Sequence, residues 1–94
     1  MTVKVFIKRK LHDNNAVELT FLLNKLRALA LNQPGYVSGE TFHRLDKKDE
    51  CMVIGTWRSL EDWNSWVNNP LRIEVQTAID RLLGEVTEYA IYRY

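Results

Sequence analysis

The spacing of hydrophobic residues changes repeatedly along this chain of 94 residues, and the order of the changes constrains the fold more than any single motif. Residues 3–11 begin with apolar side chains at every second position, Val3, Val5 and Ile7, which predicts a half-buried strand. Residues 12–15 have turn and N-cap chemistry, and leucines then recur at helical spacing from Leu19 to Leu29. Residues 33–35, Gln-Pro-Gly, are expected to end this helix because proline and glycine disfavour its continuation.

A hairpin and a short helix are predicted next. Residues 36–45 and 51–57 favour strands, and the segment between them is short and polar, so the two strands should pair antiparallel. Ser59 can cap a second helix, since acidic residues follow in its first turn and apolar residues recur at helical spacing as far as Val67. Residues 68–70, Asn-Asn-Pro, are expected to interrupt that helix.

A third helix and a final strand complete the pattern. Proline is favoured in a first helical turn, so a helix can run from Pro70 to Leu83, with Gly84 as its C-cap. Residues 85–94 alternate again with a period of two and are rich in tyrosine. The order β-α-β-β-α-β in a single domain, residues 1–94, predicts an α+β, ferredoxin-like sandwich with helices over one face of a four-stranded antiparallel sheet.

The other face of this sheet is also expected to be apolar. Both parities of the strands carry bulky apolar residues, and one layer of helices covers only one face. Examples are Val5 and Ile7 beside Phe6, and Val53 and Trp57 beside Met52 and Ile54. An exposed apolar face usually marks an interface, and a twofold copy is the commonest partner. We therefore expect a homodimer in which two sheets pack face to face.

Charge and cysteine content exclude several classes of protein. Thirteen Lys and Arg against twelve Asp and Glu give a net charge of +1, too little to attract nucleic acid or an anionic membrane. The basic run Lys8-Arg9-Lys10 is interpreted as a solvated strand end. The single cysteine, Cys51, predicts neither an internal disulfide nor a metal site. The lack of a leader or a long apolar stretch predicts a cytoplasmic protein.

Three segments carry a resemblance to a known family. They are Gln-Pro-Gly-Tyr-Val-Ser-Gly-Glu at 33–40, Gly-Thr-Trp-Arg-Ser-Leu-Glu-Asp-Trp at 55–63 and Asn-Asn-Pro at 68–70. In this order and spacing the chain, from Val3 to Tyr94, resembles the antibiotic biosynthesis monooxygenase family of the dimeric α/β-barrel superfamily. The resemblance implies that fold, a substrate pocket between the sheet and the later helices, and oxidation of an aromatic or quinol substrate.

The resemblance also implies which positions to compare. Many members carry a histidine in the second helix and another after the helix break, but this chain has Trp66 and Leu71 there, so two candidates for proton transfer are missing. Haem-degrading relatives use a first-strand asparagine, a tryptophan and a later histidine. The matching positions hold Arg9, Trp66 and Gln76, and glutamine is a poor axial ligand, so haem degradation is disfavoured.

Three tryptophans and one histidine are the leading candidates for a site. Trp57, Trp63 and Trp66 could give a pocket flat walls for an aromatic ligand, although the pattern favours a core role for the first two; Trp66 fits either role. His43 lies in a predicted strand, and histidine exchanges protons near neutral pH, which makes it the candidate base against the simpler interpretation of a partly exposed strand residue. His12 is expected to be a solvated turn residue.

Two residues of the third predicted helix and the tyrosines of the last strand have two interpretations each. Arg72 and Gln76 lie one turn apart and could line the mouth of a pocket or be solvated helix surface. Tyr89, Tyr92 and Tyr94 could donate to a ligand, but tyrosine is a routine cross-strand packing residue, and we favour packing.

Two hypotheses of function follow from these residues. The first is a small-molecule monooxygenase that needs no cofactor and no metal, with Trp66 holding an aromatic or quinol substrate and His43 taking a proton. The second is a non-catalytic homodimer that binds a small apolar ligand.

Overall fold

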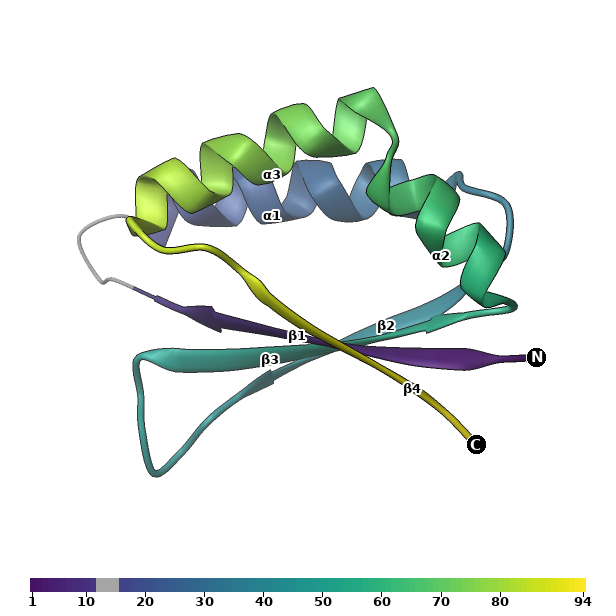
Figure 1. The fold of residues 1–94 in the computed structure, drawn as a ribbon. Coiled ribbons are helices and arrows are strands. Elements are labelled where there is room, and N and C mark those ends of the chain that lie inside the picture. The colour runs from purple at the N-terminus through teal and green to yellow at the C-terminus, as the bar shows by residue number, and fades with distance from the viewer. Residues whose placement is uncertain (12–15) are drawn as a thin grey trace.

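The elements follow the predicted order. The computed structural model describes residues 1–11 and 16–94, with the elements β1 (Val3–Lys10), α1 (Ala16–Leu31), β2 (Tyr36–His43), β3 (Glu50–Trp57), α2 (Leu60–Val67), α3 (Pro70–Leu83) and β4 (Glu88–Arg93). The four strands pair antiparallel in the order β2-β3-β1-β4. Helices α1 and α3 lie side by side over one face of the sheet, and α2 stands at one end (Figure 1). This is the α+β, ferredoxin-like sandwich; the turn expected at 12–15, with His12, lies outside the described residues.

Local capping sets the helix boundaries. The hydroxyl of Ser59 accepts a hydrogen bond from the backbone N–H of Asp62 at 3.1 Å, and the side chain of Asn69 accepts one from the N–H of Leu71 at 2.9 Å. Pro70 occupies the first turn of α3, where its missing N–H has no partner to lose. Gly84 ends α3 in the left-handed region, with a φ of 70°.

Two strand ends differ from the prediction. Strand β2 stops at His43 because the chain turns into the hairpin, where Leu45 is 92% exposed. Strand β4 begins only at Glu88, since the backbone N–H of Thr87 donates to the Asp80 carboxylate at 3.3 Å. Alternating apolar residues therefore continue beyond the strands into positions that have no sheet partner.

The register separates the two faces of the sheet. Val5 pairs with Gly55 and Ile7 with Val53, and these residues face the helices. On this side the core forms two clusters. The first contains Val3, Val5, Ala30 and the three tryptophans, and the second contains Leu19, Val75, Ile79 and Leu83. No helix among residues 1–11 and 16–94 is long and apolar enough to cross a membrane.

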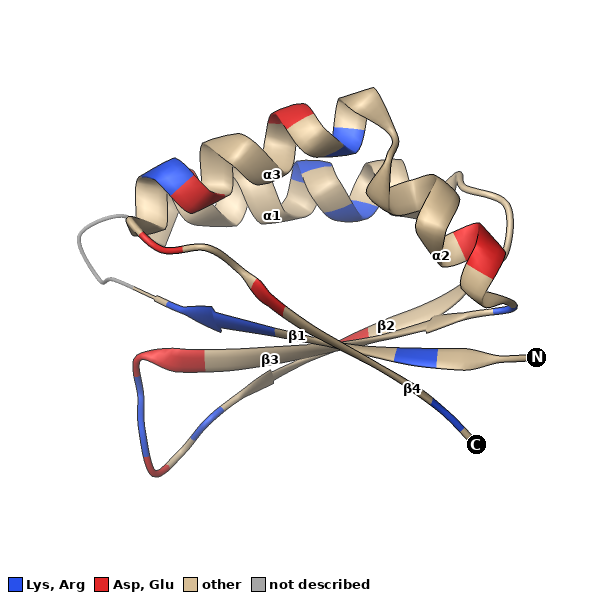
Figure 2. Cartoon of the chain, viewed as in Figure 1, with Lys and Arg blue, Asp and Glu red and all other residues tan. Residues whose placement is uncertain are grey.

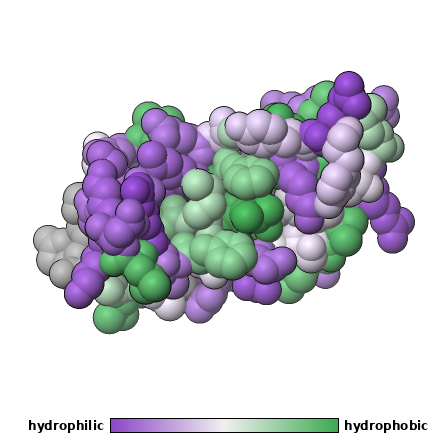
Figure 3. Space-filling view, turned by 90° about the horizontal axis from the view of Figure 1, so that it is seen from below, coloured by the Kyte–Doolittle hydropathy of each residue, from purple (hydrophilic) through white to green (hydrophobic). Residues whose placement is uncertain are grey.

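The outer face of the sheet, turned away from the helices, carries an apolar patch. Its central side chains come from three strands: Phe6, Met52, Ile54, Ala90 and Tyr92. The rings of Phe6 and Tyr92 meet edge to face, with centroids 5.2 Å apart. Figure 3 shows this patch at the centre of the face, bordered by hydrophilic residues. We call it the outer patch.

Candidate functional site

An apolar cavity of about 180 Å³ lies between α1 and the helix side of the sheet. Leu23, Leu26 and Ala30 line it from α1, and β2 and β3 contribute Gly39, Thr41, Val53 and Gly55. The two glycines leave space that a side chain would take. A Cβ atom at Gly39 would lie 2.7 Å from the hydroxyl of Tyr36, and one at Gly55 would lie 3.5 Å from Nε1 of Trp57. The cavity therefore depends on bare backbone in its floor.

One end of the cavity is aromatic. Trp57, Trp63 and Trp66, which we call the tryptophan cluster, line it together with Tyr36. The ring of Trp57 stacks on Trp66 with centroids 6.1 Å apart and meets Trp63 at 5.9 Å. The three tryptophans are only 2%, 3% and 5% exposed, so the core role predicted for Trp57 and Trp63 is confirmed and Trp66 shares it. The same rings therefore belong to the hydrophobic core and form one wall of the cavity.

The opposite end of the cavity is polar, with Arg9, Cys51 and His43 among its lining residues. The register places Arg9 opposite Cys51 on β3, and Cys51 opposite His43 on β2. His43 is exposed at the rim, as the simpler interpretation predicted. Figure 2 shows a blue stretch at this end of β1, beside the start of β3, and a second blue segment of β1 near the N-terminus. Arg9 is far from His43 and Cys51 in the sequence, but the three residues lie on adjacent strands at this end of the cavity.

The interpretation of the basic run as a solvated strand end is wrong for Arg9, which is 4% exposed. Its parity is the reason: Arg9 continues the series Val3, Val5, Ile7 on the helix side, so the period of two already contained the signal. Burial lowers the pKa of Arg9 from its ordinary value, with a smaller contribution in the same direction from Arg72. A guanidinium remains charged even so, and the cavity therefore contains a buried cation.

Among the described residues Arg9 has one side-chain hydrogen bond. Its Nη2 donates to Oε1 of Gln76 at 3.2 Å, whereas its Nε is buried without an acceptor in the described part of the chain. The amide of Gln76 is oriented by its other end, since Nε2 donates to Asp80 at 2.9 Å and to the Thr87 hydroxyl at 2.8 Å. Thr87 in turn donates to Asp80 at 2.7 Å. This network holds the guanidinium in place, and no carboxylate of residues 1–11 or 16–94 is in direct contact with it.

Neither Gln76 nor Arg72 lies where the sequence suggested, which was the mouth of a pocket or the solvated surface of the helix. They are 7% and 6% exposed, so neither is solvated helix surface, and neither is among the residues that line the cavity. Arg72 donates to the hydroxyl of Tyr89 at 2.5 Å and to the carbonyl of Val67 at 3.2 Å. Its guanidinium carbon also lies 5.4 Å from the ring centroid of Tyr89 and 6.0 Å from that of Trp63. Arg72 thus ties β4 to the junction of α2 and α3.

The three tyrosines at the end of the sequence, Tyr89 and Tyr92 in β4 and Tyr94 after it, have different surroundings. Tyr89 packs at 5.9 Å on Trp63 as expected, and it also accepts the hydrogen bond from Arg72. Burial raises the pKa of the Tyr89 hydroxyl. Tyr92 belongs to the outer patch, and Tyr94 is 85% exposed. None of the three is a lining residue of the cavity.

The two ends of the cavity are well separated along the sheet. Trp57 pairs with Val3 and Cys51 pairs with Arg9, so the two pairs are six positions apart along β1. At the usual rise this is roughly 20 Å of backbone. A small ring cannot touch both Trp66 and His43, so a ligand that uses both must be elongated.

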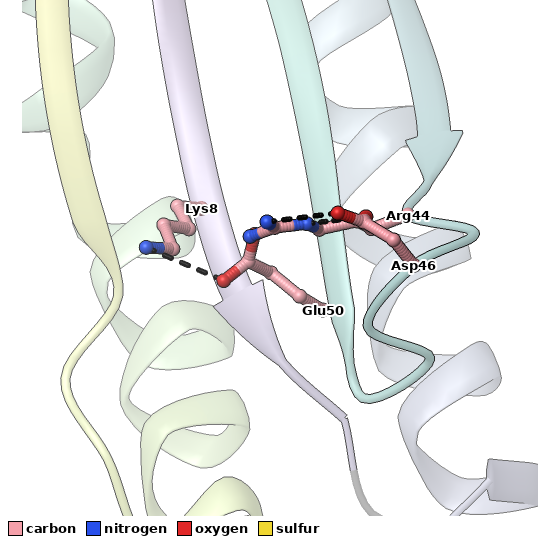
Figure 4. Close-up of polar contacts among 4 residues, drawn as sticks. All are labelled: Lys8, Arg44, Asp46 and Glu50. Atoms are coloured by element: carbon pink, nitrogen blue, oxygen red, sulfur yellow. Dashed lines mark hydrogen bonds and ion pairs between the residues drawn. The ribbon is translucent and has the colours of Figure 1, made fainter.

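A cluster of ions lies at the start of β3. Arg44 donates to Glu50 at 2.9 Å and to Asp46 at 2.7 Å, and Lys8 lies 3.3 Å from the second oxygen of Glu50 (Figure 4). The hydrogen bond from Arg44 is the main cause that lowers the pKa of Glu50, and it also lowers the pKa of Asp46. The two carboxylates are therefore more acidic in the folded chain than in the unfolded one.

Acid should destabilise the protein through Glu50. A lowered folded pKa contributes stability above the ordinary value of 4.5, and this contribution is lost as the pH falls through the lowered pKa. We expect Glu50→Gln to lower the melting temperature at neutral pH and to reduce the further drop between about pH 5 and about pH 3. Thermal unfolding monitored by circular dichroism measures both, with Glu85→Gln, an exposed acid, as the control. Parallel profiles for wild type and Glu50→Gln would contradict the assignment.

No group of three His, Cys, Asp or Glu side chains in the described part of the chain is placed to hold a metal ion. Cys51 is buried, and burial is the main cause that raises the pKa of its thiol. The cavity offers aromatic contact at one end, and a guanidinium with an imidazole at the other.

Comparison with solved structures identifies the same architecture in other organisms. A conserved protein from Methanosarcina mazei is 17% identical with a TM-score of 0.89, over 99% of this chain and 92% of that one. SnoaB, a cofactor-independent oxygenase from Streptomyces nogalater, is 20% identical with a TM-score of 0.85, over 99% and 92%. Rv0793 from Mycobacterium tuberculosis is 15% identical with a TM-score of 0.86, over 100% and 95%. At these identities the likeness shows the fold.

The sequence itself gives the family. Among curated proteins no match was found. Residues 2–78, which include β1, the three-tryptophan segment and most of α3, match the antibiotic biosynthesis monooxygenase family. The chain belongs to the antibiotic biosynthesis monooxygenase family.

Proposed function

We propose that the protein is a small-molecule monooxygenase that oxidises an electron-rich aromatic or quinol substrate in the cavity between α1 and the sheet, without a bound metal or flavin. The observation that carries the proposal is the cavity itself, which has the tryptophan cluster at one end and Arg9 and His43 at the other. Family membership and the fold shared with a cofactor-independent oxygenase support it.

The proposed reaction converts a ring CH₂, or its enol tautomer, into a carbonyl. A base removes a proton, the substrate anion passes one electron to O₂, and the resulting superoxide and substrate radical combine. The hydroperoxide then loses water. One oxygen atom enters the product and the other leaves as water, so O₂ is the only oxidant and no reductant is consumed. The protein has to hold the ring, accept a proton and exclude bulk water.

The lining residues suggest a role for each end. The tryptophan cluster would hold the ring system by stacking and edge contacts, with Trp66 and Trp57 as its main surfaces. His43 is the proposed proton acceptor, which puts the reacting carbon near the polar end. Arg72 and Gln76 would act indirectly, Arg72 by supporting Trp63 and Gln76 by orienting Arg9.

Oxygen uptake tests the reaction. With a panel of quinols and hydroxylated polycyclic aromatics, we expect wild-type protein to consume O₂ above the uncatalysed rate for at least one compound. His43→Gln should lower kcat by about 10² or more, because it removes the base. Lys47→Gln, in the exposed hairpin, is the control. Background uptake with every compound would leave the non-catalytic binding module as the function.

We also propose that two chains pack through their outer patches. The patch is apolar and lies on the face that the helices leave bare. Tyr92 in the patch is 58% exposed, and Phe42, which pairs with Met52 on the same face, is 48% exposed. An apolar face of this kind is typical of an interface between copies.

Light scattering tests the dimer. We expect wild-type protein to have twice the mass of one chain, and Ile54→Glu to have the mass of one chain because it places a charge in the centre of the interface. Lys10→Glu, which changes an exposed residue at the end of β1, should leave the mass unchanged. A wild-type mass of one chain at high concentration would contradict the proposal.

A further inference from the structure

The cavity has a charge of one sign. Arg9 and Arg27 are the only charged side chains among its described lining residues, which include no Asp or Glu. This contrasts with the whole chain, whose net charge is only +1. The acidic residues of the sheet lie elsewhere: Glu50 is engaged by Lys8 and Arg44 on the outer side. A ligand that enters the cavity therefore meets positive charge without competition from a carboxylate in its walls.

Arg9 is the charge in the cavity that is buried with the least compensation. It is 4% exposed, its Nε has no acceptor, and no carboxylate of the described residues forms an ion pair with it. Asp80 reaches it only through the amide of Gln76. A second buried guanidinium, that of Arg72, adds to the positive charge behind the cavity and is bonded only to a hydroxyl and a carbonyl. Buried charges are normally paired, so this arrangement fits a protein whose counter-charge arrives with its ligand.

The chemistry of the donor restricts the anion. A guanidinium offers two adjacent N–H groups in a fork that matches the two oxygens of a carboxylate. A carboxylate fills this fork with its two oxygens, whereas a phosphate has a further oxygen that would need another donor inside a largely apolar cavity. A single carboxylate is thus the best counterpart of Arg9.

The rest of the cavity restricts the body of the ligand. The aromatic end favours a flat ring system, and the volume of about 180 Å³ allows only a small one. Because Arg9 and the tryptophan cluster lie at opposite ends, the carboxylate has to be at one end of the molecule. We propose that the cavity selects small aromatic carboxylic acids, with the carboxylate bound by Arg9 and the rings directed toward the tryptophan cluster. The inference rests on the proposed function for the reaction, and it names the substrate class for that site.

Binding of a matched pair of probes tests the inference directly. The probes are 6-hydroxy-2-naphthoate and its primary amide, which have the same rings and differ in the charge at one end. Calorimetric titration of the full chain should show that the acid binds at least about tenfold more tightly than the amide, as expected for a charge-assisted bidentate contact. Equal affinities for wild-type protein would overturn the inference.

Variants show whether Arg9 is responsible. Arg9→Met should abolish the preference for the acid while the amide binds as before, and that unchanged affinity shows that the variant is folded. Arg9→Lys keeps the charge but loses the fork, so it should keep only part of the preference. Arg27→Met, at the exposed rim of the same cavity, should keep most of it. A preference that survives in Arg9→Met would overturn the inference, as would one that disappears only in Arg27→Met.

The test separates this inference from the proposed reaction. Arg9-dependent binding of the acid without oxygen uptake would support the binding inference and remove the monooxygenase function. Oxygen uptake from the acid that is unchanged in Arg9→Met would support the monooxygenase function and overturn the binding inference.

Discussion

Trp57→Ala is expected to cause the largest loss of stability of any single truncation in the chain, about 3–5 kcal/mol. Trp57 is 2% exposed and its ring contacts Tyr36, Trp63 and Trp66, so alanine would leave a void that three other rings border. Because these three rings sit on β2 and α2, they cannot all move to fill the space. Urea denaturation at fixed protein concentration measures the change in the free energy of unfolding.

A matched control separates this effect from the loss of any aromatic residue. Tyr94 is 85% exposed, and Tyr94→Ala should change the free energy of unfolding by no more than about 0.5 kcal/mol. If Trp57→Ala cost no more than that control, the tryptophan cluster would not be the centre of the core. The ligand probes should also lose affinity for Trp57→Ala, since the same ring is one wall of the cavity.

Arg72→Ala is expected to cost about 3 kcal/mol. The variant removes a charged hydrogen bond to the carbonyl of Val67, another to the hydroxyl of Tyr89, and the contacts of the guanidinium with two rings. It also leaves the Tyr89 hydroxyl partly buried without its donor. Urea denaturation again gives the change in the free energy of unfolding.

Two conservative variants divide the contribution of Arg72. Tyr89→Phe removes only the hydroxyl and should cost about 1 kcal/mol. Arg72→Lys keeps the charge but not the planar group that reaches Val67 and Tyr89 together, so its cost should fall between the other two. A loss below about 1 kcal/mol for Arg72→Ala would show that solvent replaces these partners and that Arg72 is not a structural link.

The fold was predictable because its signals are local. The first turn and C-cap of α3 lie at Pro70 and Gly84, where backbone chemistry alone places them. Strand ends were predicted less well, since alternation continues through Leu45 and Val86, which are 92% and 82% exposed. Whether such residues pair depends on a neighbouring strand that periodicity does not describe.

The site was only partly predictable, because its polar residues owe their positions to distant partners. The spacing of Arg72 and Gln76 placed them on one face of a helix but did not say which face. Tyr89 and Thr87, seventeen and eleven residues further along the chain, turn that face inward. Charged and amide side chains are usually solvated, and that general tendency outweighed the parity of Arg9. The pattern of apolar residues therefore predicts the core, while the buried polar network emerges only from the tertiary structure.

The bare backbone at Gly55 makes the upper size limit of the ligand adjustable. A methyl group there would meet Nε1 of Trp57 at 3.5 Å, an ordinary van der Waals contact, so it would narrow the floor without displacing the indole. At Gly39 the same addition would come within 2.7 Å of the Tyr36 hydroxyl and push that ring aside. Evolution or design can thus retune which molecules this scaffold admits by single-carbon steps on one strand, while the residues that hold the protein together stay as they are.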